Sequence, residues 1–360
     1  MHNKKSLIPI LFPAILLIVA FSGSSSGAGK SSGLVAPGAT IKKTSGFTAT
    51  EGPATDADGN VWFTEVFASR IQKWTWKDGK TTLYRENTGT ANGMMFDSEG
   101  NLVICEMGNG RIVRDDLKGN VTVIADSLNG KKLRGPNDLW IDPKGGIYFS
   151  HTAMGGSMPG GGMPGGGPPP GGGASGRGAP GGIQPRGAPG SGAPGGEMPG
   201  GGAPGGGMPG GDTSDLGIVY ITPDGKKVTL VTADITSPNG LIGTPDGKIL
   251  YVGDRGKVFA YKINSDGSLS DKKLFCEKNT DGMAMDENNN VYLTADKEIL
   301  IYSPDGELLE EITTPDGCSN VEFCGKDRKT LFFTYHENIY TLEMNVKGGQ
   351  LPIDRASGTR

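Results

Sequence analysis

The feature that most constrains the fold of this chain is a short pattern that recurs about every forty residues. A strand-forming run follows an Asp/Gly turn six times, as DADGNVWFTE, DSEGNLVICE, DPKGGIYFSH, TPDGKILYVGD, DENNNVYLTAD and GKDRKTLFFTYH. Turn residues followed by alternating or apolar runs are typical of β-hairpins. Most units then continue into another apolar run. We therefore predict an all-β chain made of six repeated units.

The spacing of the turns is even except at one place. The turn glycines Gly59, Gly100 and Gly145 are 41 and 45 residues apart, whereas Gly145 and Gly247 are 102 residues apart. Residues 155–211 hold 28 glycines and 12 prolines, and subtracting these 57 residues returns the interval to 45. Such a composition cannot build a hydrophobic core. We interpret residues 155–211 as a disordered insertion in the third unit, either a surface loop or a lid.

Six units of about 45 residues predict a six-bladed β-propeller in which each blade is a four-stranded sheet. A β-sandwich is the structural alternative, although it does not require so even a repeat. We assign residues 38–154 to the first part of the propeller, residues 212–346 to the second part and residues 347–360 to a tail.

The first 30 residues have the order of a secretory signal. Lys4 and Lys5 precede an apolar run from Leu7 to Phe21, and small residues follow. The run is about 15 residues long, shorter than the roughly 20 that a spanning helix needs, although a retained anchor is the alternative. We expect a periplasmic or secreted protein with no stable membrane association once the signal is cleaved.

Cysteine usage and charge narrow the class of protein further. None of the four cysteines has the C-x-x-C spacing of a metal site, so we treat them first as core residues. Cys318 and Cys324 are the best candidates for a disulfide in an exported chain. The 35 basic and 39 acidic residues give a net charge of -4, and there is no long basic run. Nucleic-acid partners are therefore disfavoured.

Polar side chains recur at the same place in every unit. Eight residues before each turn position stand Glu51, Asn92, Asn137, Asn239, Asp281 and Asn320. The strand that enters the turn is the innermost one of a blade, so these side chains are predicted to converge on the axis. A second polar ring on the same face is predicted at the ends of the returning strands, at Glu65, Glu106, His151, Asp254, Asp296 and His336.

The inner ring has the chemistry of a metal site. A single Asn-Gly or Asp-Gly pair could simply form a turn or cap a strand. Glu51 and Asp281 break the amide pattern, and two buried carboxylates held close resist ionising unless a cation lies between them. Ligands with oxygen atoms only favour Ca²⁺, with Mg²⁺, Mn²⁺ or Zn²⁺ as alternatives.

Ordered motifs in five of the units carry a family resemblance. They are Glu51-Gly-Pro, Gly135-Pro-Asn137-Asp138, Pro238-Asn239-Gly240-Leu241, Asp281-Gly-Met283 and Cys318-Ser-Asn320-Val-Glu-Phe323. With them the chain resembles the gluconolactonase and regucalcin (SMP-30) family of calcium-dependent six-bladed propellers. The resemblance covers most of the chain from about Gly46 to Leu342.

The resemblance implies a set of site residues. Glu51, Asn137, Asn239 and Asp281 would hold the metal or line its immediate shell, and Asn137 would also contact the substrate or a metal-bound water. Asp281 would act as base or nucleophile. Arg134 precedes the Asn137 motif, and it either orients a sugar hydroxyl or carboxylate or is a solvated surface arginine.

Four further positions follow from the same comparison. Asn92 is assigned to substrate binding. His151 stands where bacterial gluconolactonases often have an aspartate, so it is either a catalytic proton carrier or a hydrogen-bonded rim residue, and His336 could serve likewise. Ala284 stands where fluorophosphatase-like members have a second aspartate, which disfavours phosphotriester hydrolysis.

We therefore predict a monomeric, metal-dependent hydrolase of sugar lactones or related cyclic esters, with a small-molecule lactone as substrate. The competing class is a non-catalytic propeller that binds a sugar or a protein on the same face. Loss of Asp281 separates the two classes, since a hydrolase loses turnover and a binding protein need only lose affinity.

Overall fold

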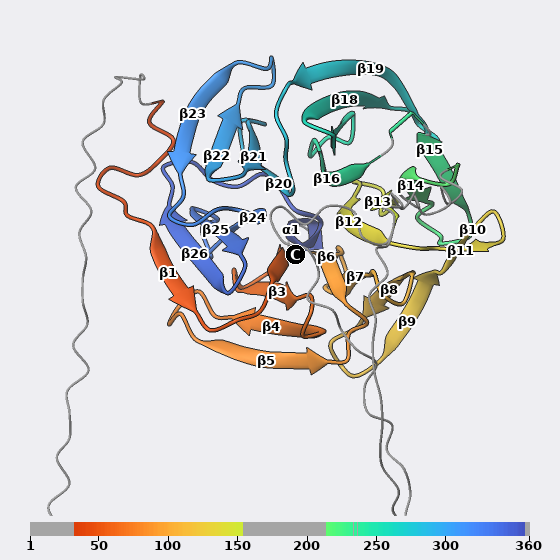
Figure 1. Ribbon diagram of the computed structural model, residues 1–360, viewed down its shortest axis with the longest axis horizontal. Helices are drawn as coiled ribbons and strands as arrows, with labels where there is room; N and C mark the ends of the chain where they lie inside the picture. Colours follow the sequence, from red (N-terminus) through yellow and green to blue (C-terminus); the bar gives the residue numbers. More distant parts are fainter. Residues whose placement is uncertain (1–31, 154–213, 233, 236, 357–360) are drawn as a thin grey trace, which may run out of the picture.

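The computed structural model describes residues 32–153 and 214–356, except 233 and 236. Its strands form six four-stranded sheets arranged around one axis (Figure 1). The prediction of an all-β, six-bladed propeller is confirmed. The predicted signal sequence, residues 1–30, and the Gly/Pro-rich insertion, residues 155–211, lie outside the described residues.

Within each of the first three blades the strands pair antiparallel in chain order from the axis outward. Blade 1 consists of β2 (Thr50–Thr55), β3 (Val61–Glu65), β4 (Arg70–Trp74) and β5 (Thr81–Glu86). Blade 2 consists of β6 (Ala91–Phe96), β7 (Leu102–Glu106), β8 (Arg111–Asp115) and β9 (Val121–Ala125). Blade 3 consists of β12 (Pro136–Ile141), β13 (Ile147–His151), β14 (Gly217–Ile221) and β15 (Val228–Thr232). The insertion thus separates the second and third strands of blade 3.

The remaining blades follow the same plan until the ring closes. Blade 4 consists of β16 (Pro238–Gly243), β17 (Ile249–Asp254), β18 (Lys257–Ile263) and β19 (Leu269–Cys276). Blade 5 consists of β20 (Met283–Met285), β21 (Val291–Ala295), β22 (Glu298–Tyr302) and β23 (Leu308–Thr313). Blade 6 consists of β24 (Asn320–Cys324), β25 (Thr330–Tyr335), β26 (Asn338–Glu343) and β1 (Lys42–Ser45). A small hairpin of β10 (Ser127–Leu128) and β11 (Lys131–Lys132) lies between blades 2 and 3.

The Asp/Gly turns form because one carboxylate caps several backbone donors. In blade 1, Oδ1 of Asp56 accepts hydrogen bonds from the backbone N–H groups of Asp58 and Asn60. Gly59 has φ of 85°, which places it in the left-handed region that glycine adopts without steric cost. Asp97, Asp142 and Asp286 repeat this arrangement in blades 2, 3 and 5. In these four blades the repeated sequence signal therefore has one physical cause, whereas in blade 4 the hydroxyl of Thr244 takes the place of the carboxylate.

The inner strands of neighbouring blades approach closely near the axis. In blades 1 to 4 the pairing of the inner strand shifts register just after its first residues, which is the mark of a β-bulge. Glycines at these bulges permit the approach. A β-carbon on Gly52 would lie 2.0 Å from the backbone oxygen of Asn92, and one on Gly240 would lie 2.2 Å from that of Asp281.

The C-terminal segment closes the axial opening at the end of the inner strands. The helix α1 (Pro352–Ala356) lies at the centre of the ring in Figure 1. Arg328 holds Asp354 in an ion pair of 2.6 Å, and Ile353 is buried in a cluster of apolar side chains from blades 1 and 2. The predicted tail therefore includes a helix that is packed against the propeller, because its apolar residues find a surface at this mouth. No helix in the described residues has the length and apolar character needed to cross a membrane.

The candidate disulfide between Cys318 and Cys324 is not formed, since all four cysteines are free. Cys324 is the last residue of the extended strand β24, and Cys318 precedes that strand by two residues. Six residues at about 3.3 Å each separate them by roughly 20 Å. A disulfide requires Cα atoms within about 7 Å. Cys105, Cys318 and Cys324 are instead buried core residues, which confirms the other part of the prediction for these three.

Removing β1 should destabilise the whole ring, because its four residues pair with β26 and complete blade 6 from the other end of the chain. Loss of this pairing is expected to lower the free energy of unfolding by several kcal/mol. A chain that begins at residue 46 should therefore melt at least about 10 °C below a chain that begins at residue 32. Thermal unfolding followed by circular dichroism measures the difference. Equal midpoints for the two truncations would show that closure by β1 contributes nothing.

Candidate functional site

The inner polar ring lies at one mouth of the propeller. Glu51, Asn92, Asn137 and Asn239 are each the second residue of an inner strand, Asn320 is the first residue of β24, and Asp281 precedes β20 by two residues. The side chains bond across blade boundaries. Nδ2 of Asn239 donates to Oδ1 of Asp281 at 2.7 Å, and Nδ2 of Asn320 donates to Oε2 of Glu51 at 3.3 Å.

Burial dominates the electrostatics of the two ring carboxylates. Desolvation raises the pKa of Glu51 above its usual value, against hydrogen bonds from Ser319, Gly52 and Asn320. Desolvation also raises the pKa of Asp281 far above its usual value, and the negative charge of Glu51 raises it further. Both shifts favour the neutral acid, because the low-dielectric surroundings penalise a second negative charge. The two carboxylates are therefore close enough to oppose each other's ionisation.

Asp138 is a third carboxylate of this mouth that the sequence prediction did not assign. Burial raises its pKa to about 7, and the charges of Glu51 and Glu322 act in the same direction. Blades 1, 2, 4 and 5 have glycine at the equivalent position, directly after the ring residue. This substitution of an acid for a glycine was the sequence signal that could have identified Asp138. At the equivalent positions in other blades the neighbouring backbone leaves little room for a side chain. A β-carbon on Gly93 would lie 2.3 Å from Oδ1 of Asp138, so this carboxylate is wedged between blades 2 and 3.

The donor set at this mouth fits a divalent cation that prefers oxygen. The side chain of Asn239 gives its N–H to Asp281, while its Oδ1 is buried and has no hydrogen-bond partner in the described part of the chain. An unpaired buried acceptor is costly, and a cation would satisfy it. Among the described residues no three His, Cys, Asp or Glu side chains gather as a metal site. The donors at this mouth are not of those four residue types alone, since the carboxylates of Glu51 and Asp281 are combined with the amides of Asn137 and Asn239.

A polar cavity of about 200 Å³ opens beside these residues. Asn137, Asn239 and Asp281 line it together with side chains from the ends of blades 3, 4 and 5, which are Thr152, Ser237, Pro238, Asp254, Arg255, Asn279 and Thr280. Ligand pockets for drug-sized molecules span about 300 to 1,000 Å³, so this cavity suits a smaller molecule. Asn92 and Arg134 are not among the described residues that line it.

His151 and Arg134 form a separate polar unit. The ring nitrogen Nε2 of His151 accepts from the backbone N–H of Arg134 at 2.9 Å, and Nδ1 lies 2.7 Å from the backbone oxygen of Asp215. Nδ1 therefore carries the proton. The guanidinium of Arg134 binds Asp215 at 2.6 Å. Burial lowers the pKa of His151, which keeps the ring neutral. These contacts are those of a hydrogen-bonded rim residue, which is one of the two roles predicted for His151.

The second polar ring lies on the same face as the first. The antiparallel pairing places Glu65 opposite Thr50, Glu106 opposite Ala91 and Asp254 opposite Pro238. The carboxylates of these three residues accept hydrogen bonds from other protein groups, so their contacts are structural.

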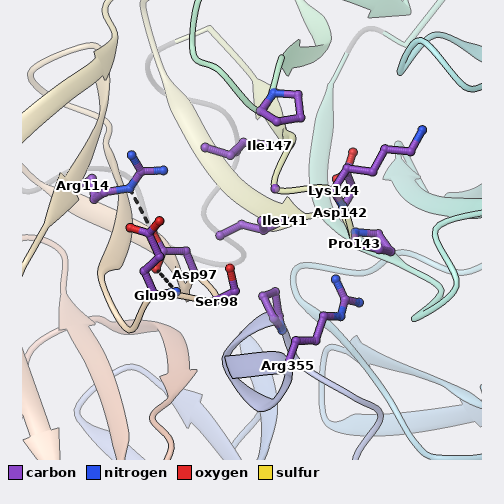
Figure 2. Close-up of a pocket in the computed structure, with 13 residues that line it drawn as sticks. Asp97, Ser98, Glu99, Arg114, Ile141, Asp142, Pro143, Lys144, Ile147 and Arg355 are labelled. Carbon is purple, nitrogen blue, oxygen red and sulfur yellow. Dashed lines mark hydrogen bonds and ion pairs between the residues drawn. The ribbon is translucent and has the colours of Figure 1, made fainter. Parts of the chain in front are cut away.

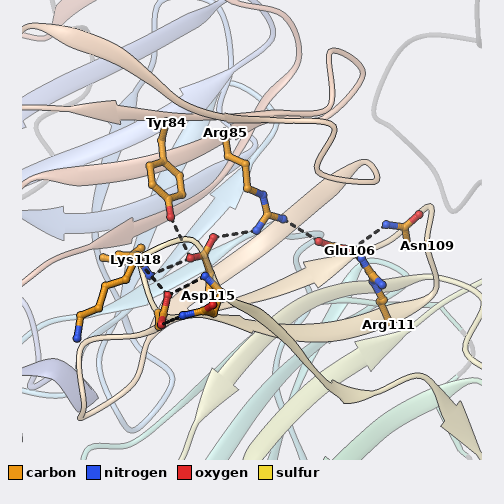
Figure 3. Close-up of polar contacts among 10 residues, drawn as sticks. Tyr84, Arg85, Glu106, Asn109, Arg111, Asp115 and Lys118 are labelled. Carbon is orange, nitrogen blue, oxygen red and sulfur yellow. Dashed lines mark hydrogen bonds and ion pairs between the residues drawn. The ribbon is translucent and has the colours of Figure 1, made fainter.

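Glu106 shows this structural role most clearly. Arg85 bridges the buried carboxylates of Glu106 and Asp115 at 2.7 and 2.8 Å, and Arg111 and Tyr84 complete the network (Figure 3). Since buried charges are stable only when paired, this network joins β5 of blade 1 to blade 2.

A second cavity lies on the opposite face, between the turns of blades 2 and 3 and α1 (Figure 2). Its volume is about 220 Å³. Its three cations already have partners. Arg114 binds Asp97 at 2.9 Å, Lys144 donates to the backbone oxygen of Ser265 at 3.0 Å, and Arg355 donates to that of Pro245 at 3.1 Å. The mouth with the buried carboxylates is therefore the better candidate site.

A six-bladed propeller with an acidic and amide-lined axial mouth defines the class of this protein. The family model described as the SMP-30/gluconolactonase/LRE-like region matches residues 49–167 and 196–337. The chain belongs to this family, as the sequence motifs predicted.

Individual relatives agree with this assignment. A gluconolactonase from Zymomonas mobilis is 23% identical over 335 residues, which cover 83% of this chain and 79% of that protein. The solved gluconolactonase of Xanthomonas campestris is 23% identical, with a TM-score of 0.68 over 87% of this chain and 92% of its own. The calcium-binding protein regucalcin from Agrobacterium tumefaciens is 16% identical, with a TM-score of 0.62 over 86% and 94% of the two chains. The two structures show that the fold is shared.

Glu322 is a further acid of the axial channel, near the mouth that the C-terminal segment covers. It shares a small cavity with residues of that segment, Gly349 to Pro352. Burial raises its pKa to about 7, although the charge of Arg328 opposes the shift. The stability that neutral Glu322 confers is fully present below its unfolded pKa of about 4.5 and is lost as the pH rises through about 7.

Glu322→Gln should therefore raise the free energy of unfolding relative to the wild type, and this gain should be larger at pH 8 than at pH 5. The variant keeps an oxygen that can accept the backbone N–H of Phe323 but cannot ionise. Its free energy of unfolding, relative to the wild type, is expected to rise by on the order of 2 kcal/mol between the two pH values. Urea denaturation in the presence of a chelator measures it, with Glu307→Gln on an exposed turn as control. A difference that does not change with pH would contradict the buried, neutral state.

Proposed function

We propose that this protein is a divalent-cation-dependent hydrolase of sugar lactones or related cyclic esters, with Ca²⁺ as the cation. The observation that carries the proposal is the unpaired, buried Oδ1 of Asn239 beside the carboxylates of Asp281 and Glu51. The family and its gluconolactonase members support the reaction class. The calcium-binding relative supports the choice of metal.

Glu51, Asn137, Asn239 and Asp281 would hold the cation through oxygen atoms only, as Ca²⁺ prefers. When bound, a divalent cation lowers the pKa of adjacent acids and polarises a carbonyl oxygen as a Lewis acid. Asn239 fixes the orientation of the Asp281 carboxylate through its 2.7 Å hydrogen bond. Asn137 lines the same cavity and presents an amide to the substrate.

The reaction consumes one water per lactone. The carboxylate of Asp281 accepts a proton from the water as its oxygen bonds to the carbonyl carbon of the lactone. The ring C–O bond then breaks, and the released alkoxide oxygen takes up the proton that Asp281 accepted from the water. The product is the open-chain hydroxy acid. Asp281 is buried and lines one wall of the cavity, so its carboxylate is within reach of a water held there beside the lactone.

Asp281→Asn should abolish turnover while leaving the propeller folded. The amide cannot accept the proton, and a loss of kcat of about 10³ is expected from removal of a general base. Hydrolysis of glucono-1,5-lactone in a pH-stat, before and after chelation and after Ca²⁺ is restored, measures the effect. The matched control is Asp246→Asn, on an exposed turn.

Two results would contradict the proposed function. One is wild-type protein that holds no stoichiometric divalent metal and shows no chelator-sensitive hydrolysis, which would leave the non-catalytic binding propeller. The other is an Asp281→Asn variant with wild-type kcat.

His151→Gln should leave the chemical step nearly unchanged, because both ring nitrogens are occupied by backbone groups of residues 134 and 215. We expect kcat within a few-fold of wild type, no change in the pH profile between pH 5 and 7, and a lower melting temperature. Rate measurements across that pH range, together with thermal unfolding, test this. A hundredfold loss of kcat with unaltered melting would instead make His151 a catalytic residue.

A further inference from the structure

One residue of the candidate cavity has no assigned role. Arg255 lines the cavity beside Asp281 and Asn239, and it is the only cationic side chain among the described residues that do so. It comes from the turn that joins β17 to β18, at the outer end of blade 4 on this face. Its guanidinium is therefore placed where a bound small molecule would meet it.

Arg255 is an exposed residue, and its side chain has no partner among the residues that the structure describes. The nearest acid in sequence, Asp254, uses Oδ1 to accept the backbone N–H of Ser237 at 2.8 Å. In the described part of the chain no ion pair or side-chain hydrogen bond is formed by Arg255. Every other arginine there has one, to a carboxylate or a carbonyl: Arg70, Arg85, Arg111, Arg114, Arg134, Arg328 and Arg355.

The backbone at Arg255 is a poor match for its residue type. Asp254 pairs with Lys257, so Arg255 and Gly256 form a two-residue hairpin loop, with φ of 47° and 78°. The same loop position in blades 5 and 6 holds Asp296 and His336, with φ of 53° and 50°. Aspartate, asparagine and histidine tolerate this region better than other residues with a β-carbon. Other residues with a β-carbon share this φ, so the backbone alone assigns no role, but an arginine held there at the lip of a cavity supports a function for its side chain.

We propose that Arg255 recognises an anionic group on the substrate, so that the preferred substrates are lactones that carry a carboxylate or a phosphate in addition to the ring ester. This inference rests on the proposed lactonase function. Guanidinium groups bind carboxylates and phosphates through paired, charge-assisted hydrogen bonds, which neutral hydroxyl groups do not match. The amides and hydroxyls elsewhere in the cavity, such as Asn279 and Thr152, suit the hydroxyl groups of a sugar.

The test compares three substrates with Arg255→Asn. The substrates are glucono-1,5-lactone, which is neutral, glucaro-1,4-lactone, which has a carboxylate, and 6-phosphoglucono-1,5-lactone, which has a phosphate. Asparagine removes the charge and suits the hairpin loop, so the variant should fold at least as well as the wild type. We expect KM to rise at least tenfold for one of the anionic lactones and less than twofold for the neutral one.

Two further variants separate charge from local structure. Arg255→Lys should restore part of the preference for the anionic lactone, since it restores the charge without the planar fork. Lys257→Ala removes a cation two residues away that faces Glu277 and does not line the cavity, so it should leave all three KM values unchanged. The anionic substrate that loses affinity identifies the group that Arg255 binds.

The possible failures are distinguishable. If wild type and Arg255→Asn hydrolyse the neutral and anionic lactones with the same KM ratios, the role of Arg255 is refuted while the lactonase function stands. If Arg255→Asn changes only the melting temperature, Arg255 serves the hairpin alone and the inference is equally refuted. If the calcium-loaded wild type hydrolyses none of the three lactones, the proposed function fails and the inference falls with it.

Discussion

Burying several carboxylates at one mouth of the propeller is the constraint on which the rest of this structure depends. Glu51, Asp138 and Asp281 lie where water is largely excluded, and burial raises the pKa of each. Such a cluster is stable only with bound protons or with a cation between the acids. The amide oxygen of Asn239 is a further buried acceptor that is unpaired within the described residues at the same place. A bound cation would both neutralise the carboxylates and pair with the oxygen of Asn239.

The propeller supplies this cluster by repetition. Each blade begins its inner strand at the same mouth, and the glycine that follows the ring residue in four blades lets neighbouring strands approach. Pairing of β1 with β26 closes the ring, so the six starting points keep fixed positions. The segment that ends in α1 covers the opposite mouth. The reactive groups therefore face solvent from one side only, where the cavity lined by Asp281 and Arg255 opens.

The repeat explains what could be predicted from the sequence. A constant spacing of eight residues between ring residue and turn was enough to place Glu51 and Asp281 at one mouth, because strand register carries over from blade to blade. Features that break the repeat were missed. Asp138 occupies a glycine position, and the neutral hydrogen-bonded state of His151 depends on a backbone oxygen 64 residues away. The candidate disulfide between Cys318 and Cys324 is not formed, because the chain between them runs into an extended strand that holds them apart, which their spacing in sequence does not reveal.

The most direct measurement of the central claim is anomalous diffraction from crystals of the chelator-treated protein soaked in a terbium salt, since Tb³⁺ replaces Ca²⁺ at oxygen sites. We expect one strong peak within bonding distance of Oδ1 of Asn239 and of the carboxylates of Glu51 and Asp281. Crystals of an Asp281→Asn variant should lose or weaken that peak. Terbium bound only at surface acids, with the axial mouth holding water alone, would contradict the account.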